Sequence, residues 1–477
     1  MLFNTFSYAL FLPLVFFVYW ASNRNLRRQN LWLQAASYFF YACWDWRFLF
    51  LLLFSTLLDF GTGIMMEGSK SKLEKRIWFW LSVVINLGFL GVFKYFNFFA
   101  ESFADLLNAF GMRADIPTLK VILPVGISFY TFHGLSYVID VYNERIKAER
   151  SFIDYALFVT FFPLLVAGPI ERATHLLPQI KKPRTFNYVS AADGLRQILW
   201  GLFKKIVIAD QIVPFVNPIF ENPLNFSAST LLIGAVMFAF QIYGDFSGYS
   251  DIAIGTARLF GINLLRNFAY PYFSRDVAEF WRRWHISLSS WFRDYVYIPL
   301  GGSKGNTLFK VRNVLIIFLL SGFWHGANWT FIFWGFLNAL FVILAILSKT
   351  NRNNLEIVAA DRALPTAREF IAITTTFGLT VLMWIFFRAE SMSLAWTYAS
   401  SIFDISLFTI PNPFPKSLIL VTTFLLVIEW MGRRKDFALA EVGMSWPRYL
   451  RWGFYQAIML SILWVPSVGQ QFVYFQF

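Results

Sequence analysis

The chain has 477 residues, of which 57% are hydrophobic and 20% aromatic, whereas only 14% are charged. A soluble domain usually carries about 25% charged residues, so this composition excludes an ordinary soluble enzyme. The net charge is +13, but the Lys and Arg residues lie in short loops between apolar runs, as anionic lipid headgroups favour. We therefore expect membrane lipids, and no nucleic acid, as binding partners.

Apolar runs recur along the whole chain, and a membrane-spanning helix needs roughly 20 mostly apolar residues. The sequence predicts an all-α polytopic membrane protein with roughly eleven to thirteen transmembrane or re-entrant helices. We expect one membrane domain over residues 1–477, with no separate soluble domain. The predicted segments, in chain order, are 1–20, 31–44, 48–66, 77–99, 118–142, 152–168, 195–220, 231–259, 314–347, 370–387, 417–431 and 452–465.

Basic loops predict the orientation of these segments. Residues 24–28, 70–76 and 258–312 concentrate Lys and Arg and are expected on the cytoplasmic side, which puts the N-terminus outside. The first apolar run has no basic region before it and no small-residue cleavage site, so we interpret it as a retained helix. Cys43 is the single cysteine, so an internal disulfide is impossible.

Residues 258–312 differ from the other loops because bases alternate there with Trp, Phe and Tyr. This pattern predicts amphipathic helices in the cytoplasmic interface. His285 lies in this stretch beside Arg282, Arg283 and Arg293. Two interpretations stay open for the arginines: they hold lipid phosphates, or they attract a phosphate-bearing donor such as coenzyme A.

His325 lies inside the longest apolar run, residues 314–347. At about 1.5 Å per residue a helix of this length spans roughly 50 Å, so it must tilt steeply or break, and Gly322 and Gly326 are the expected places for a break. A titratable group at membrane depth is costly and usually faces the protein interior or a cavity. His325 is therefore a candidate functional residue, and Asn328 is expected on the same helical face; a structural histidine is the alternative.

Asp245 and Asp251 belong to a polar, glycine-containing stretch, residues 243–251, inside another apolar run. We expect a helix break there, lined by protein or water, and the two carboxylates are candidate substrate- or donor-binding residues. His133 and His175 are expected to be structural. The chain contains no Gly-rich phosphate loop, no His-Glu-x-x-His motif and no Gly-x-Ser-x-Gly elbow, and we expect no metal site.

Six sequence blocks together resemble the membrane-bound O-acyltransferase (MBOAT) family, in the branch of the alginate O-acetylation membrane protein. They occur in the family's order, over about residues 30–350, followed by C-terminal helices over 370–466. The blocks are Leu123-Pro-Val-Gly-Ile-Ser-Phe-Tyr-Thr-Phe, Phe162-Pro-Leu-Leu-Val-Ala-Gly-Pro-Ile, Tyr243-Gly-Asp-Phe-Ser-Gly-Tyr-Ser-Asp, Phe280-Trp-Arg-Arg-Trp-His-Ile-Ser-Leu-Ser, Asp294-Tyr-Val-Tyr-Ile-Pro-Leu-Gly-Gly and Ser321-Gly-Phe-Trp-His-Gly-Ala-Asn-Trp.

The resemblance implies helices around a central funnel or tunnel, with His325 as the catalytic histidine and His285 as a second functional position. It implies O-acetyl transfer from a cytoplasmic donor, acetyl-CoA, to an extracytoplasmic polysaccharide, an alginate-like polymer or peptidoglycan. A periplasmic SGNH-type acetyltransferase partner and the bacterial inner membrane are further implications. Histidine suits the chemistry, since removing a hydroxyl proton needs a base with a pKa near working pH, while Asn328 and the backbone near Gly326 are candidate oxyanion donors.

Two other functions stay open at this point. D-alanyl transfer towards teichoic acid is the alternative within acyl transfer, because those enzymes share the histidine. A transporter without catalysis is the alternative from another class, with the intramembrane His and Asp residues as a proton relay.

Overall fold

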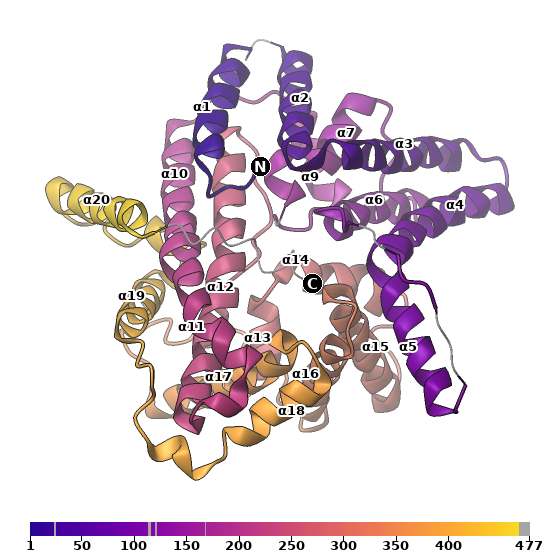
Figure 1. Cartoon of the computed structure of the whole chain (residues 1–477). Helices are drawn as coiled ribbons and strands as arrows, with labels where there is room; N and C mark the ends of the chain where they lie inside the picture. Colours follow the sequence, from indigo (N-terminus) through magenta and orange to yellow (C-terminus); the bar gives the residue numbers. More distant parts are fainter. Residues whose placement is uncertain (23–24, 113–115, 120–121, 167, 467–477) are drawn as a thin grey trace. The chain divides into compact units, whose positions relative to one another are not determined.

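The computed structural model describes residues 1–22, 25–112, 116–119, 122–166 and 168–466. Within these ranges all regular structure is helical, which confirms the predicted all-α class (Figure 1). The chain divides into two compact units. The first unit comprises Met1–Ala191 and Thr256–Leu265, and the second comprises Ala192–Gly255 and Arg266–Phe477.

The first unit is held together by close contacts between its apolar helices. A Cβ atom at Gly63 would lie 2.6 Å from the Tyr137 hydroxyl, so α3 and α6 touch where glycine allows it. The Asp59 carboxylate of α3 accepts hydrogen bonds from Ser82 (2.6 Å) and Asn86 (2.7 Å) of α4. The helices of this unit are α1 (Phe6–Ala21), α2 (Leu26–Asp45), α3 (Arg47–Gly68), α4 (Lys72–Leu90), the π-helical turn η1 (Gly91–Tyr95), α5 (Phe96–Ala109), α6 (Ile127–Tyr142), α7 (Phe152–Thr160), α8 (Phe162–Leu165) and α9 (Ala173–Ile180).

The second unit begins within α10 (Tyr188–Leu202) and includes α12 (Ala228–Leu259) as far as Gly255. These two helices pack through glycines, since a Cβ atom at Gly201 would lie 2.6 Å from the carbonyl oxygen of Gly248. The other helices are η2 (Phe203–Ala209), α11 (Asp210–Glu221), η3 (Pro223–Asn225), η4 (Pro271–Phe273), α13 (Val277–Arg283), α14 (Ile286–Phe292), η5 (Arg293–Tyr297), α15 (Thr307–His325), α16 (Trp329–Leu347), α17 (Ala367–Arg388), α18 (Met392–Ser401), η6 (Ile405–Phe408), α19 (Lys416–Gly432), η7 (Ala438–Ala440) and α20 (Arg448–Trp464).

Six helices among the described residues are long and apolar enough to cross a membrane, which confirms a multi-pass membrane protein. The other predicted segments form helices that fall short in length or hydropathy, so the full number of eleven to thirteen stays a prediction. The six are 47–68, 72–109, 228–259, 307–325, 329–347 and 367–388.

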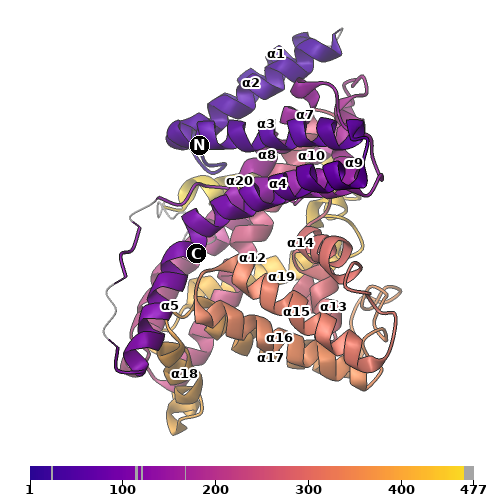
Figure 2. The same ribbon diagram turned by 90° about the vertical axis from the view of Figure 1, so that its right-hand side faces the viewer.

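The long segment 314–347 breaks where the sequence predicted. α15 ends at His325, α16 begins at Trp329, and the two helices lie side by side (Figures 1 and 2). Their contact depends on Gly322 and Gly335, because a Cβ atom at Gly322 would lie 2.3 Å from the carbonyl oxygen of Phe331, and one at Gly335 would lie 2.3 Å from that of Phe318. The Asn328 side chain caps α16 by accepting a hydrogen bond from the amide of Thr330 at 3.0 Å.

Three expectations about boundaries are wrong. Residues 243–251 do not break the helix, because α12 runs continuously through them. Segment 152–168 is interrupted at Phe161, where α7 ends and α8 begins with a proline at its first turn. In segment 118–142 the helix α6 begins at Ile127, after Gly126, whose φ of +75° suits glycine, and the described residues before it are not helical. Arg24 of the first basic loop lies outside the described residues.

Candidate active site

His325 is the last residue of α15, at the turn that separates α15 from α16. Its side chain is buried, with 3% of the residue exposed. Aromatic rings surround it: the centroids of Trp324, Trp334 and Phe387 lie 5.0, 5.2 and 5.4 Å from that of the imidazole. Because Trp334 belongs to α16 and Phe387 to α17, three helices of the second unit hold His325 in an apolar enclosure.

His285 occupies the turn between α13 and α14 and is completely buried. Its backbone adopts the left-handed conformation, with φ 43° and ψ 54°, which is uncommon for a residue with a Cβ atom. Its Nδ1 atom lies 2.9 Å from Oδ1 of Asn267. Burial lowers the pKa of His285 to about 3, so the imidazole is neutral at physiological pH.

The two histidines predicted as catalytic meet in the second unit. Their ring centroids lie 6.3 Å apart, although the two residues are 40 positions apart in the chain. Aromatic rings pack around the pair. The ring centroid of Phe246 on α12 lies 4.6 Å from that of His285. A neutral imidazole beside a second imidazole in a water-poor enclosure is suited to moving a proton between reacting groups.

Asp245 and Asp251, predicted to bind substrate or donor, lie on α12 in buried ion pairs. Lys205 pairs with Asp245 at 2.6 Å and with Asp210 at 2.8 Å. Lys204 pairs with Asp251 at 2.6 Å. Both lysines belong to η2, a π-helical turn, and such turns occur often at functional sites. In the described structure these carboxylates therefore serve first to neutralise buried lysines.

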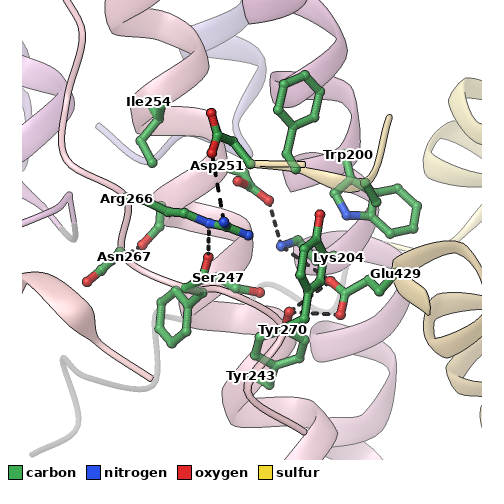
Figure 3. A pocket seen from close by; sticks show the side chains of 15 residues that line it. Trp200, Lys204, Tyr243, Ser247, Asp251, Ile254, Arg266, Asn267, Tyr270 and Glu429 are labelled. Carbon is green, nitrogen blue, oxygen red and sulfur yellow. Dashed lines mark hydrogen bonds and ion pairs between the residues drawn. The ribbon is translucent and has the colours of Figure 1, made fainter. Parts of the chain in front are cut away.

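A small polar cavity lies beside this network (Figure 3). Its volume is about 20 Å³, enough for about one water molecule. Glu429 of α19 reaches the cavity and accepts a hydrogen bond from the Tyr243 hydroxyl at 2.8 Å. Lys204 lies 3.9 Å from the same carboxylate. The cavity is lined by Trp200, Lys204, Tyr243, Ser247, Ser250, Asp251, Ile254, Arg266, Asn267, Phe268, Tyr270, Glu429, Asp436, Phe437 and Ala438.

The three arginines predicted to recruit the donor differ in how firmly they are held. Arg283 donates to Glu279 of its own helix at 2.8 Å and to the carbonyl oxygen of Ala269 at 3.2 Å, and 13% of its side chain is exposed. Arg282 is exposed and donates to the carbonyl oxygens of Asn351 (3.0 Å) and Asn354 (2.8 Å). The third arginine, Arg293, pairs with its neighbour Asp294, and 61% of its side chain is exposed. Arg282 and Arg293 are thus accessible to a ligand, whereas Arg283 fastens α13.

The expectation that Asn328 shares a helical face with His325 is wrong, because α15 ends at His325 and Asn328 caps the next helix. Its Nδ2 atom donates to the carbonyl oxygen of Glu390 at 2.9 Å. An amide nitrogen carries two hydrogens, so a second N–H remains for another acceptor. His175, expected to be structural, pairs with Glu171 at 2.7 Å in the first unit, and this hydrogen bond raises its pKa.

Sequence reasoning missed Lys204, Lys205, Glu429 and Asn267. A usable signal existed for the first three, because each is a charged residue inside a predicted membrane segment and such residues are usually functional or paired. Asn267 gave no signal, since it lies in a non-helical stretch and its side-chain partners Ser250, His285 and Ser287 are 17 to 20 positions away in the chain.

Comparison with known proteins identifies relatives along most of the chain. Residues 2–386 match the family model described as MBOAT, membrane-bound O-acyltransferase family. The probable alginate O-acetylase AlgI of Azotobacter vinelandii is 38% identical over 443 residues, covering 91% of this chain and 85% of the relative. The peptidoglycan O-acetyltransferase of Helicobacter pylori is 37% identical over 428 residues, covering 83% of this chain and 78% of the relative.

A more distant match is the teichoic acid D-alanyltransferase of Streptococcus thermophilus. It is 30% identical over 268 residues, which cover 52% of this chain and 63% of the relative. The matched family region includes both buried histidines and ends near the end of α17, before α18, α19 and α20.

Proposed function

Because this chain belongs to the membrane-bound O-acyltransferase family, we propose that it transfers acetyl groups from cytoplasmic acetyl-CoA to hydroxyls of an extracytoplasmic polysaccharide. The acceptor is an alginate-like exopolysaccharide or peptidoglycan, the polymers named for the relatives that cover most of the chain. The membrane is the bacterial inner membrane, since a cytoplasmic donor and an envelope acceptor meet only across it. A periplasmic SGNH-type acetyltransferase completes the delivery to the polymer.

One observation carries the proposal: two buried histidines lie 6.3 Å apart beside the break in a spanning segment. A break of this kind leaves helix ends inside the protein, which is tolerated only where protein or a water-filled cavity surrounds them. The carbonyl end of α15 carries partial negative charge, which favours the imidazolium that forms when His325 accepts a proton. His325 is therefore assigned as the general base and His285 as a secondary residue.

The reaction balances with these groups alone. A nitrogen of His325 removes the proton from the acceptor hydroxyl while the hydroxyl oxygen bonds to the thioester carbonyl carbon. The carbon–sulfur bond then breaks, and the thiolate of coenzyme A takes the proton from the imidazolium. The second N–H of Asn328 is a candidate donor to the developing oxyanion.

Arg282 and Arg293 support the identity of the donor. Both are exposed bases in the stretch that follows α12, on the side predicted to be cytoplasmic. Coenzyme A carries phosphate groups, which guanidinium groups bind with paired hydrogen bonds. Arg283 contributes through its hydrogen bond to the carbonyl oxygen of Ala269 at 3.2 Å, which ties α13, the helix that precedes His285, to the preceding segment.

Acetate analysis of the cell envelope tests this function. Base-released acetate and D-alanine are measured on exopolysaccharide, peptidoglycan and teichoic acid fractions from wild-type cells, deletion cells and deletion cells carrying His325→Gln. The proposal predicts that one polysaccharide fraction loses acetate in the deletion and that only the wild-type gene restores it.

Loss of D-alanine with unchanged acetate would instead favour D-alanyl transfer. That alternative rests on the similarity to the teichoic acid D-alanyltransferase of Streptococcus thermophilus. Normal acetate and D-alanine on every fraction of the deletion strain would refute acyl transfer to the envelope. Because the chain belongs to an acyltransferase family, acetyl transfer and D-alanyl transfer are both favoured over a transport function.

A further inference from the structure

The side chain that fixes His285 belongs to none of the residues predicted as functional. Asn267 is completely buried and lies in the stretch between α12 and α13. Its backbone carbonyl accepts a hydrogen bond from the amide of Ile286 at 2.9 Å, and the amide of Ala269 donates to the carbonyl of Arg283 at 2.9 Å. These two bonds clamp the turn that carries His285, and they maintain its left-handed backbone.

The hydrogen bonds of the Asn267 amide group define the histidine tautomer. Its Nδ2 atom donates to Oγ of Ser250 on α12 at 3.0 Å, so the oxygen of the amide is the atom that faces His285. That oxygen also accepts the Ser287 hydroxyl at 2.9 Å. An amide oxygen only accepts hydrogen bonds, so Nδ1 of His285 must carry the hydrogen in the 2.9 Å bond between them.

The other ring nitrogen is consequently left with a lone pair. Nε2 of His285 is buried and has no hydrogen-bond partner among the described residues. Aromatic rings of Phe246, Phe268 and Trp324 pack around the imidazole, and His325 is the titratable group that faces it. A buried polar atom without a partner is costly, so its position calls for a ligand that supplies a polar hydrogen.

We propose that Asn267 is a positioning residue that holds His285 in its Nδ1–H tautomer, so that Nε2 accepts a hydrogen bond from a substrate. The inference rests on the proposed function, because it assigns a partner to the second histidine of that site. Two sources supply a suitable polar hydrogen: the hydroxyl of the acceptor, or an amide N–H of the pantetheine arm of the donor. Ser250 acts on His285 indirectly, because its hydroxyl accepts a hydrogen bond from the Asn267 side chain and so orients that amide.

Selective ¹⁵N labelling of histidine in the purified protein tests the tautomer without relying on activity. The chain has four histidines, and a His285→Gln spectrum assigns the signal of interest. The wild-type protein should show His285 as a neutral imidazole with Nδ1 protonated. Asn267→Leu should remove the preference for this tautomer. An Nε2-protonated wild-type His285, or an unchanged tautomer in Asn267→Leu, would overturn the proposal even if the enzyme transfers acetyl groups as proposed.

Asn267→Asp supplies a second readout, because a carboxylate beside Nδ1 stabilises the imidazolium and should raise the pKa of His285. The ¹⁵N signals of His285 should then show the imidazolium at higher pH than in the wild-type protein. Asn338→Asp is the matched control: Asn338 is equally buried on α16, accepts the Trp281 indole N–H and donates to the Trp334 carbonyl, so its aspartate loses one donated hydrogen bond, as Asn267→Asp does at Ser250. The control should keep the wild-type pH profile of these signals. Equal profiles for both variants would contradict a positioning role.

Steady-state kinetics of Asn267→Leu identify the source of the polar hydrogen. A roughly tenfold higher KM for acetyl-CoA alone assigns Nε2 to the pantetheine arm, and the same rise for the polysaccharide alone assigns it to the hydroxyl. Ser250→Ala should reproduce the same pattern with a smaller change. A loss of kcat with both KM values unchanged would contradict substrate contact at Nε2.

Discussion

Removing the charge of Lys204 should destabilise the second unit severely. Its Nζ atom lies 2.6 Å from Asp251 and 3.9 Å from Glu429, and the exposed fractions of the three side chains are 4%, 13% and 3%. At an effective dielectric constant of about 20 these separations correspond to gross attractions of roughly 6 and 4 kcal/mol. Desolvation offsets much of that gain, but breaking a buried pair by removing one partner costs about 3–5 kcal/mol.

Lys204→Met should therefore lower the melting temperature of the detergent-purified protein by roughly 10 °C, taking about 2–4 °C per kcal/mol. Tryptophan fluorescence during heating measures this change. Adding Asp251→Leu should recover part of the loss, because one uncompensated carboxylate is then removed. Asp436→Asn is the control: Asp436 pairs with Arg266 at 3.8 Å beside the same cavity but is 72% exposed, so its loss should cost under about 1 kcal/mol. Melting of Lys204→Met within 2 °C of wild type would refute the reasoning.

The double variant Arg282→Gln with Arg293→Gln should raise the KM for acetyl-CoA more than it lowers kcat. An unchanged KM would instead favour the interpretation that both arginines bind lipid headgroups. Gly322→Val should lower stability by about 1–3 kcal/mol through overpacking against α16, and a wild-type melting curve would contradict the close contact. Cysteines placed at Ser69 and Lys304, in a protein without its native cysteine, should resist an impermeant thiol reagent added to intact cells. Labelling of either site from outside would overturn the predicted topology.

Hydrophobicity was sufficient to predict the class and most helix positions, because membrane helices need long apolar runs whatever their neighbours are. The break near Gly326 was also predictable, since one helix of 34 residues exceeds the thickness of a bilayer. The stretch around Asp245 and Asp251 misled the same reasoning. Its polar side chains suggested irregular backbone, whereas lysines from η2 neutralise them and the helix continues.

Site residues were predictable only where the residue type and its immediate sequence neighbours indicated a function. His325 and His285 were chosen from their positions and the family resemblance, and the structure brings their rings together. The contact between Asn267 and His285 depends on a turn whose left-handed residue is not a glycine, and no sequence pattern marks such a residue. Likewise, the capping role of Asn328 depends on where α15 ends, which the apolar pattern leaves open within a few residues.

The central claim is that His325 is the general base, and the His325→Gln enzyme tests it most directly. Glutamine preserves hydrogen bonding and much of the volume within the aromatic enclosure, but it cannot remove a proton near neutral pH. Acetyl transfer is measured with purified protein in vesicles, with radiolabelled acetyl-CoA, the proposed SGNH-type partner and the polysaccharide identified by envelope analysis. We expect wild-type yield and melting temperature with a transfer rate lowered by about 10²–10⁴-fold. A rate near that of the wild-type enzyme would contradict the assignment and leave His285 as the remaining candidate base.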